Sequence, residues 1–413
     1  MKNIKRMDKK LIDRLIKEYG SPLYVFQKER LVSDYKRLVG AFRSRYPKYK
    51  VAYSYKTNYA PHICKIMKGM GALAEVVSDM ELSIAKKVGY WNNEIIYNGP
   101  MKGPLMEDFL LGGGIVNIDN SAEAERIINL ANANPYKILT VGIRVNMNVG
   151  QNFVSRFGME AYTDEFDTVF KKLEDTKNIE IVGMHCHIGH SRHLEAWKIR
   201  AEYMLDVVDH YFKRPLKFID LGSGMFGNVE ESFGKQFGDY IPSFEDYAEV
   251  VAGAFAEHYK NTLDEEKPWL LTEPGTTIIS ANMDVITTVT GMKTVRGRHF
   301  ANTDSSIHIV GELCRIKDLP IEVVNANPNS QYFDDITLSG YTCLEYDVIL
   351  KNFKGKVGVG DYLIVGNCGG YTNVSKPPFI GPQCAMIELD ENNNTFLFKR
   401  SETVDDILST YIF

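Results

Sequence analysis

Val51-Ala-Tyr-Ser-Tyr-Lys-Thr-Asn58 is the stretch around which the rest of the chain is organised. Its apolar and small residues predict a short strand that ends in Lys56. The carboxyl ends of the strands in an α/β barrel form the face where chemistry is usually built, so a lysine there points its amine into the barrel mouth. Most lysines at strand ends are solvated tips, so the remaining sequence must decide between the two interpretations.

Strand-like and helix-like segments alternate from this stretch to about residue 276. Helical periodicity is clear in Leu194–Tyr211 and Phe244–Tyr259, among others. Eight strands alternating with helices predict a (β/α)8 barrel of the TIM type. The expected strands are Val51–Tyr55, Leu73–Val77, Ile95–Tyr97, Ile115–Ile118, Ile138–Val145, Ile181–His187, Lys217–Leu221 and Trp269–Thr272.

The texture of the sequence changes after Thr276, where helical periodicity weakens and short apolar runs alternate with Gly and Asn-Pro. This pattern predicts an all-β C-terminal domain, which the early strand Leu23–Phe26 joins. We therefore expect a barrel over residues 28–276 and a β-rich domain made of residues 1–27 and 277–413. The strands expected in it are Asp284–Thr290, Ile307–Val310, Ile321–Val324, Ile336–Ser339, Tyr362–Val365 and Ala385–Leu389.

Composition excludes several classes of function. The 413 residues are 44% hydrophobic and 24% charged, as in an ordinary globular protein. A formal net charge of −5 without a basic stripe argues against nucleic acid as a partner. No apolar run approaches the ~20 residues that span a membrane, and the basic start Met1–Lys10 lacks the apolar segment of a secretory signal. We expect a cytoplasmic enzyme.

His185-Cys-His-Ile-Gly-His190 closes the sixth expected barrel strand. Alternation along a strand places His185 and His187 on one side, where both could face the barrel mouth. Their spacing suits a zinc pair, but no third ligand stands at a telling distance and the six cysteines contain no C-x-x-C pair, so we predict no metal. An imidazole that covers an aromatic cofactor and a hydrogen-bonded core histidine both remain open.

Two further stretches follow the last two barrel strands. In Asp220-Leu-Gly-Ser-Gly-Met225, Gly222 and Gly224 leave backbone N–H groups unshielded, which suits a phosphate, although Gly-x-Gly also forms ordinary turns. In Thr272-Glu-Pro-Gly275, Glu273 places a carboxylate at the barrel mouth unless it is only an exposed residue before a turn.

The order of these stretches is typical of one family once Ser155-Arg-Phe-Gly158, Tyr341-Thr-Cys-Leu-Glu-Tyr-Asp347 and Cys368-Gly-Gly-Tyr371 are added. From Ser21-Pro-Leu-Tyr-Val25 to Cys384 the chain resembles the fold-type III pyridoxal-phosphate decarboxylases, the group of diaminopimelate, ornithine and arginine decarboxylases. Single motifs are weak, but their combination is specific.

The resemblance implies a role for each matching residue. Lys56 would form the Schiff base with pyridoxal phosphate, and Cys343 would protonate the carbanion left after carbon dioxide departs. Glu273 would face the pyridine nitrogen, and His187 would stack on the ring. The phosphate would be held by Gly222, Ser223, Gly224 and Tyr371, with Glu75 near the cofactor and Arg156, Glu345 and Asp347 near the substrate.

The resemblance also implies a homodimer with shared active sites, because the cysteine loop of relatives reaches into the neighbouring subunit. Four departures concern specificity. Thr276 stands where many relatives carry arginine, and Leu344 stands where they carry the acid that receives a distal ammonium. His190 and Ser223 replace a usual Ser and Gly.

We therefore expect an amino-acid α-decarboxylase whose small-molecule substrate is modified or carrier-tethered and belongs to a specialised biosynthetic pathway. An amino-acid racemase of the same barrel family is one alternative, although Glu273 argues against it because alanine racemases place an arginine at the pyridine nitrogen. A non-catalytic, cofactor-binding regulatory homologue is the other, and the retained Lys56, Glu273, Cys343 and Tyr371 argue against that.

Overall fold

The computed structural model describes residues 7–150, 152 and 154–413, so the first part of the basic start Met1–Lys10 lies outside the described residues. The chain divides into two compact units. One contains Asp34–Gly227 and Ile241–Thr277, and the other contains Met1–Ser33, Asn228–Tyr240 and Ile278–Phe413. In the part of the chain that is described, no helix has both the length and the apolar character needed to cross a membrane.

The first unit is a closed barrel of parallel strands, as predicted. Each strand pairs in parallel with its neighbours, and the pairings of β5 with β6 and of β10 with β2 complete the ring. The two-residue strand β7 (Met159–Glu160) extends from β6. The barrel strands are β2 (Tyr49–Ser54), β3 (Leu73–Val76), β4 (Ile95–Tyr97), β5 (Ile115–Ile118), β6 (Leu139–Asn146), β8 (Ile179–His185), β9 (Phe218–Asp220) and β10 (Trp269–Thr272).

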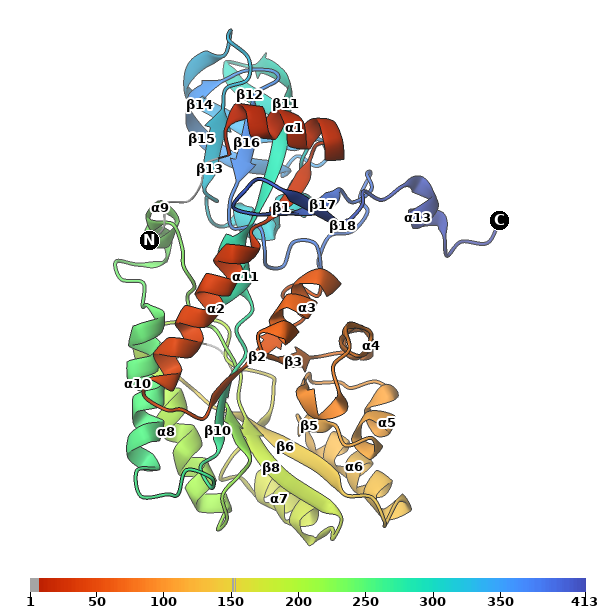
Figure 1. Cartoon of the computed structure of the whole chain (residues 1–413), viewed down its shortest axis with the longest axis vertical. Coiled ribbons are helices and arrows are strands. Elements are labelled where there is room, and N and C mark those ends of the chain that lie inside the picture. The colour runs from red at the N-terminus through yellow and green to blue at the C-terminus, as the bar shows by residue number, and fades with distance from the viewer. Residues whose placement is uncertain (1–6, 151, 153) are drawn as a thin grey trace. The chain divides into compact units, whose positions relative to one another are not determined.

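Helices surround these strands (Figure 1). Several begin at a residue whose side chain accepts a backbone N–H of the first turn, such as Ser78, Asn120 and Ser243, which fixes where the helix starts. Apolar side chains from several of the barrel strands pack together, including Ala52, Val182 and Leu271. The helices are α2 (Lys28–Arg43), which begins in the other unit, α3 (Pro61–Gly69), α4 (Asp79–Val88), α5 (Leu105–Leu111), α6 (Ser121–Ala133), α7 (Asp164–Asp175), α8 (Leu194–Tyr211) and α10 (Phe244–His258).

The second unit is built on a mixed sheet. Its strand β1 (Leu23–Phe26) pairs antiparallel with β11 (Met283–Val295) and parallel with β17 (Ala385–Leu389), so the N-terminal strand joins the C-terminal domain as predicted. The sheet also contains β12 (Arg298–Thr303), β13 (Ile321–Val324), β14 (Gln331–Ser339), β15 (Val348–Val357), β16 (Tyr362–Val365) and β18 (Thr395–Lys399). The remaining α-helices in the described part of the chain are α1 (Lys9–Tyr19), α9 (Glu231–Gly234), α11 (Thr276–Ile279), α12 (Ile307–Val310) and α13 (Val404–Leu408).

The prediction of a strand at Ile307–Val310 is wrong, because this segment is the helix α12. The carboxylate of Asp347 accepts the N–H of Ile307 at 2.8 Å, which satisfies a donor that a helix start leaves unpaired. Gly311, with a φ of 97°, ends the helix. The segment has only four residues, three of them apolar, which is too short for a period that separates helix from strand, and the partner that decides it is distant in sequence.

Candidate active site

Lys56 lies in the turn that follows β2, and its amine contacts a buried carboxylate. Its Nζ is 2.8 Å from Oε2 of Glu75 at the end region of β3. Ser54 donates its hydroxyl to the same oxygen at 2.6 Å. The side chain of Glu75 is 1% exposed and that of Lys56 is 26% exposed. The carboxylate therefore holds the amine at a barrel end while leaving it accessible.

Glu273 follows β10 and is surrounded by nitrogen atoms. Its Oε2 lies 2.9 Å from Nδ1 of His187, and its Oε1 lies 3.0 Å from Nε2 of His185. Asn98 donates its side-chain N–H to Oε1 at 2.5 Å. Glu273 comes directly after the carboxyl end of β10, and His187 comes shortly after the carboxyl end of β8. Parallel strands of a barrel end at the same face, which explains why residues 86 positions apart meet.

Asn98, which sequence reasoning missed, links the two carboxylates. Its amide donates to Oε1 of Glu75 at 3.2 Å as well as to Glu273, and its own oxygen accepts an N–H from Asn117 at 2.7 Å. Lys56 and Glu273 thus belong to one buried polar network. The available signal was position, because Asn98 directly follows β4 and so reaches the same barrel end.

The carboxyl groups of Asp220 and Glu273 are driven to opposite protonation states. Burial, reinforced by the negative charge of Glu273, raises the pKa of Asp220 well above its usual range. Burial alone would also raise the pKa of Glu273, but His185, His187 and the charge of Lys56 outweigh it and hold that pKa well below its usual range. Burial lowers the pKa of His187 to about 4. The cluster therefore favours the ionised form of Glu273 and the protonated form of Asp220, and His187 is neutral at pH 7.

The glycine-rich turn after β9 requires its two glycines. Gly222 and Gly224 have φ values of 63° and 106°, and a Cβ on them would lie 2.5 Å from the carbonyl oxygen of Cys186 and 2.4 Å from that of Ile188. Only glycine lets this turn lie against the segment that carries His187. Between them, the N–H of Ser223 lies 3.3 Å from Nδ1 of His187. Backbone donors and imidazole therefore share one small region.

These residues fit the pyridine cofactor that the resemblance implies. An amine able to form a covalent link, a carboxylate kept ionised and a turn with glycine N–H groups lie at one barrel end, which is the donor set for an aldehyde, a ring nitrogen and a phosphate. A metal is the rival, since ligand atoms of His185, Asp220 and Glu273 lie within 4.8 Å of one another. The side-chain N–H that Asn98 donates to Glu273 occupies an oxygen that a metal would need, which favours the cofactor.

Arg156 lies in the barrel unit, in the loop between β6 and β7. Its guanidinium stacks 4.2 Å above the ring of Phe157, and that ring also contacts the guanidinium of Arg144 at 4.8 Å. Arg144 in turn pairs with Asp119 at 3.1 Å. The side chain of Arg156 is exposed, so it is available to a carboxylate in solution.

Cys343, Glu345, Asp347 and Tyr371 all belong to the other unit. Cys343 and Glu345 are exposed, and Tyr371 is 47% exposed with a φ of 55°. Both carboxylate oxygens of Asp347 are used within the unit, one by the N–H of Ile307 and the other by the N–H of Thr342 at 3.0 Å. Asp347 therefore stabilises the conformation of the loop that carries Cys343.

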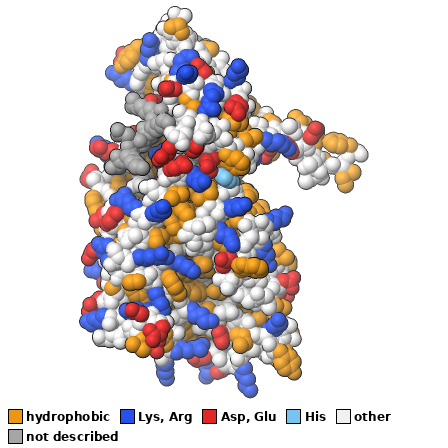
Figure 2. Space-filling model, viewed as in Figure 1, with side chains coloured by type: hydrophobic (Ala, Val, Ile, Leu, Met, Phe, Trp, Pro, Cys, Tyr) orange, Lys and Arg blue, Asp and Glu red, His pale blue; other side chains and the backbone are white. Residues whose placement is uncertain are grey.

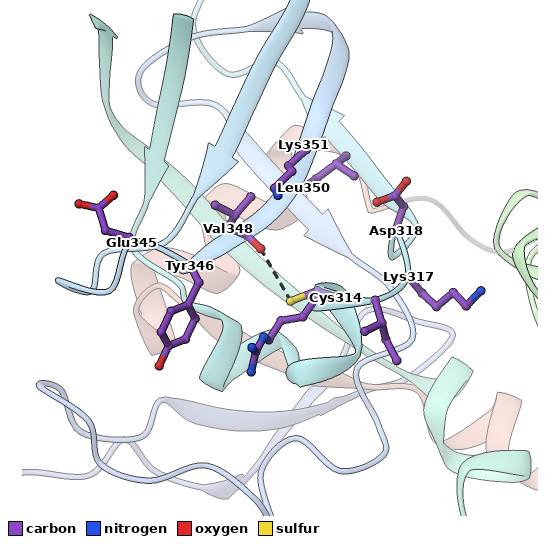
Figure 3. A pocket seen from close by; sticks show the side chains of 10 residues that line it. Cys314, Lys317, Asp318, Glu345, Tyr346, Val348, Leu350 and Lys351 are labelled. Carbon is purple, nitrogen blue, oxygen red and sulfur yellow. Dashed lines mark hydrogen bonds between the residues drawn. The ribbon is translucent and has the colours of Figure 1, made fainter. Parts of the chain in front are cut away.

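Glu345 lines a pocket of about 500 Å³ in this unit. Figure 3 shows Glu345 and Tyr346 at one end of the pocket, with Lys317 and Asp318 at the other. Cys343 is not among the lining residues, so this pocket is not where the thiol would act.

On the molecular face drawn in Figure 2, basic and acidic side chains are interspersed rather than gathered by sign.

Comparisons with known proteins agree with this geometry. Residues 32–280, more than half of the chain, match the family model described as pyridoxal-dependent decarboxylase, pyridoxal binding domain. A diaminopimelate decarboxylase of Aquifex aeolicus is 24% identical over 415 residues, covering 96% of this chain and 93% of the relative. One of Methanothermobacter thermautotrophicus is 25% identical, covering 95% and 92%. The crystal structure of the Methanocaldococcus jannaschii diaminopimelate decarboxylase with L-lysine has a TM-score of 0.82 at 22% identity, covering 97% and 94%.

Proposed function

The chain belongs to the pyridoxal-dependent decarboxylases, and we propose that it removes the α-carboxyl group of an amino acid whose distal end is not an ordinary ammonium group. The observation that carries this proposal is the buried network in which Asn98 joins Glu75, the partner of Lys56, to Glu273. It holds the covalent anchor and the carboxylate for the pyridine nitrogen in fixed relation at one end of the barrel.

Pyridoxal phosphate, when bound, supplies an electron sink for the carbanion that remains after carbon dioxide leaves. In the proposed mechanism Lys56 provides the amine that anchors the cofactor and is exchanged for the amine of the substrate. The ionised Glu273 favours a protonated pyridine nitrogen, and neutral His187 covers the ring without adding a competing charge. Gly222, Ser223 and Gly224 bind the phosphate, with the hydroxyl of Tyr371 as a further donor.

Cys343 donates the proton that replaces the carboxyl group on the α-carbon, so that amino acid and proton give amine and carbon dioxide. Its thiol is exposed on a loop held by Asp347. We place this loop in the active site of a second copy of the chain, which makes the enzyme a dimer with shared sites. Arg156 and Glu345 are the proposed contacts for charged groups of the substrate.

The substrate proposal rests on two uncharged residues. Thr276, the first residue of α11, and Leu344, next to Cys343, stand where the resemblance places an arginine and an acid. Diaminopimelate decarboxylases are similar to this chain over nearly its whole length, but these two changes remove charges that a free diamino acid would need. A distal end that is acylated, or tethered to a carrier protein in a specialised pathway, needs neither charge.

Carbon dioxide release from a panel of amino acids tests the proposal directly. We expect the purified protein with pyridoxal phosphate to decarboxylate an N-acylated or carrier-linked amino acid at least about tenfold faster, by kcat/KM, than diaminopimelate, ornithine or lysine, because a buried methylene or polar mismatch changes kcat/KM by that order. A preference for diaminopimelate would refute the substrate class. Loss of optical activity without carbon dioxide would identify a racemase, and binding without turnover would identify a regulatory homologue.

Mixing two defective variants tests the shared site. Cys343→Ala is expected to lower kcat by about 10²-fold, because a positioned general acid contributes that order. Lys56→Ala is expected to be inactive. If each site takes one residue from each subunit, a mixed dimer has one intact site, and random mixing restores about a quarter of wild-type kcat. Mixed dimers isolated by two affinity tags and found inactive would contradict the shared site, and an unchanged rate in Cys343→Ala would remove its role as proton donor.

A further inference from the structure

Arg200 donates hydrogen bonds to the glycine-rich turn, and it takes no part in the proposed chemistry. It belongs to α8 and its side chain is fully buried. One terminal nitrogen, Nη1, donates to the carbonyls of Leu221 and Ser223, both at 2.9 Å, and Nη2 donates to the carbonyl of Ile188 at 3.0 Å. The guanidinium therefore links two carbonyls of the turn, those of Leu221 and Ser223, to the carbonyl of Ile188, which follows His187 in the chain.

These hydrogen bonds set the direction of the turn's donors. In a planar trans peptide the C=O and the following N–H point in opposite directions. Because the Ser223 carbonyl is directed at Arg200, the N–H of Gly224 is directed away from it. Gly224 has a φ of 106° and is held too close to Ile188 for any Cβ, so this orientation is fixed by packing as well.

Among the residues that the structure describes, the three hydrogen-bond acceptors of the Arg200 guanidinium are backbone carbonyls, and none is a carboxylate. Its guanidinium lies 4.0 Å from the centre of the Trp197 ring, which packs edge-on against Tyr247 at 5.6 Å. Burial lowers the pKa of Arg200 to about 10, so the group is still a cation at neutral pH. A buried cation is costly unless an anion compensates it. The charge of Glu273 offsets part of this cost, and an anion on the turn would add to that compensation.

We propose that Arg200 is a positioning residue for the phosphate of the cofactor. It orients the N–H of Gly224 through the Ser223 carbonyl and adds positive charge next to the turn, while Thr276 stands where many relatives carry an arginine. This inference rests on the proposed use of the glycine turn as the phosphate site. Its consequence is specific: loss of Arg200 weakens binding of pyridoxal phosphate but hardly affects binding of pyridoxal, which has the same ring and aldehyde without the phosphate.

Titration of the apoenzyme with both compounds tests this, with the visible absorbance of the Lys56-linked ring as the readout. In Arg200→Met we expect the Kd for pyridoxal phosphate to rise at least about tenfold and the Kd for pyridoxal to change less than about twofold, since charged hydrogen-bond geometry acts on the phosphate alone. Arg43→Met is the matched control, because Arg43 also donates to a carbonyl, that of Tyr49 at 3.0 Å, but at the opposite end of β2. It should leave both Kd values unchanged.

Equal weakening of both compounds, or of neither, in Arg200→Met would overturn the inference. If that variant does not fold by circular dichroism, Arg200→Lys decides, because an ammonium cannot reproduce the three-carbonyl fork. We expect its ratio of the two Kd values to rise at least about threefold, and an unchanged ratio would overturn the inference. A wild-type protein that binds neither compound would instead overturn the proposed function.

Discussion

Lys56→Ala is expected to abolish the visible absorbance of covalently bound pyridoxal phosphate and to lower kcat by about 10⁴-fold or more, because it removes the amine that Glu75 holds at the barrel end. Fold should be retained. Glu75, the buried partner of Lys56, keeps donors from Ser54 at 2.6 Å and Asn98 at 3.2 Å, so its carboxylate is not left without hydrogen bonds. Absorbance spectroscopy and carbon dioxide release measure the two effects.

Lys50→Ala is the control for this substitution. Lys50 lies in the same strand, β2, but its amine is 5.2 Å from the ring centre of Trp269, at the start of β10 and away from the barrel mouth. It should bind cofactor and turn over substrate like the wild type. Covalent binding that survives in Lys56→Ala would show that another lysine carries the cofactor, and the assignment of the site would fail.

The barrel and the residues at its mouth could be predicted from sequence for one physical reason. Parallel strands end at the same face, so Lys56, His187 and Glu273 had to converge once their strands were recognised. Asn98 obeys the same rule, but an asparagine after a strand is also an ordinary turn residue, so its type carried no signal.

The contacts of Arg200 and the helix at Ile307–Val310 could not be predicted from local sequence patterns. An arginine on a helix is normally solvated, and only the three-dimensional path of the glycine turn shows that three carbonyls surround Arg200. The helix at Ile307–Val310 depends on Asp347, forty residues away, for its first N–H. Both depend on contacts between segments distant in sequence, to which local periodicity is blind.

Glu273→Gln is expected to keep the cofactor covalently bound and to lower kcat by about 10³-fold at pH 7, because the isosteric amide preserves the shape of the site but removes the negative charge that favours a protonated pyridine nitrogen. Asn98 can still donate to the amide oxygen, so the network is retained. Titration with pyridoxal phosphate separates binding from turnover. A wild-type kcat in this variant would show that the carboxylate does not tune the ring.

The pH dependence of the same variant carries a second, sharper expectation. The pKa of Asp220 is raised by burial and also by the negative charge of Glu273, so the glutamine substitution lowers that pKa from its wild-type value. This shift brings the ionisation of Asp220 to lower pH than in the wild type, and the ionised carboxyl returns a negative charge within 4.8 Å of residue 273. The kcat of Glu273→Gln should therefore increase with pH, whereas the double variant Glu273→Gln/Asp220→Asn should show no such increase. If kcat depended on pH in the same way in both variants, ionised Asp220 would not replace the negative charge of Glu273.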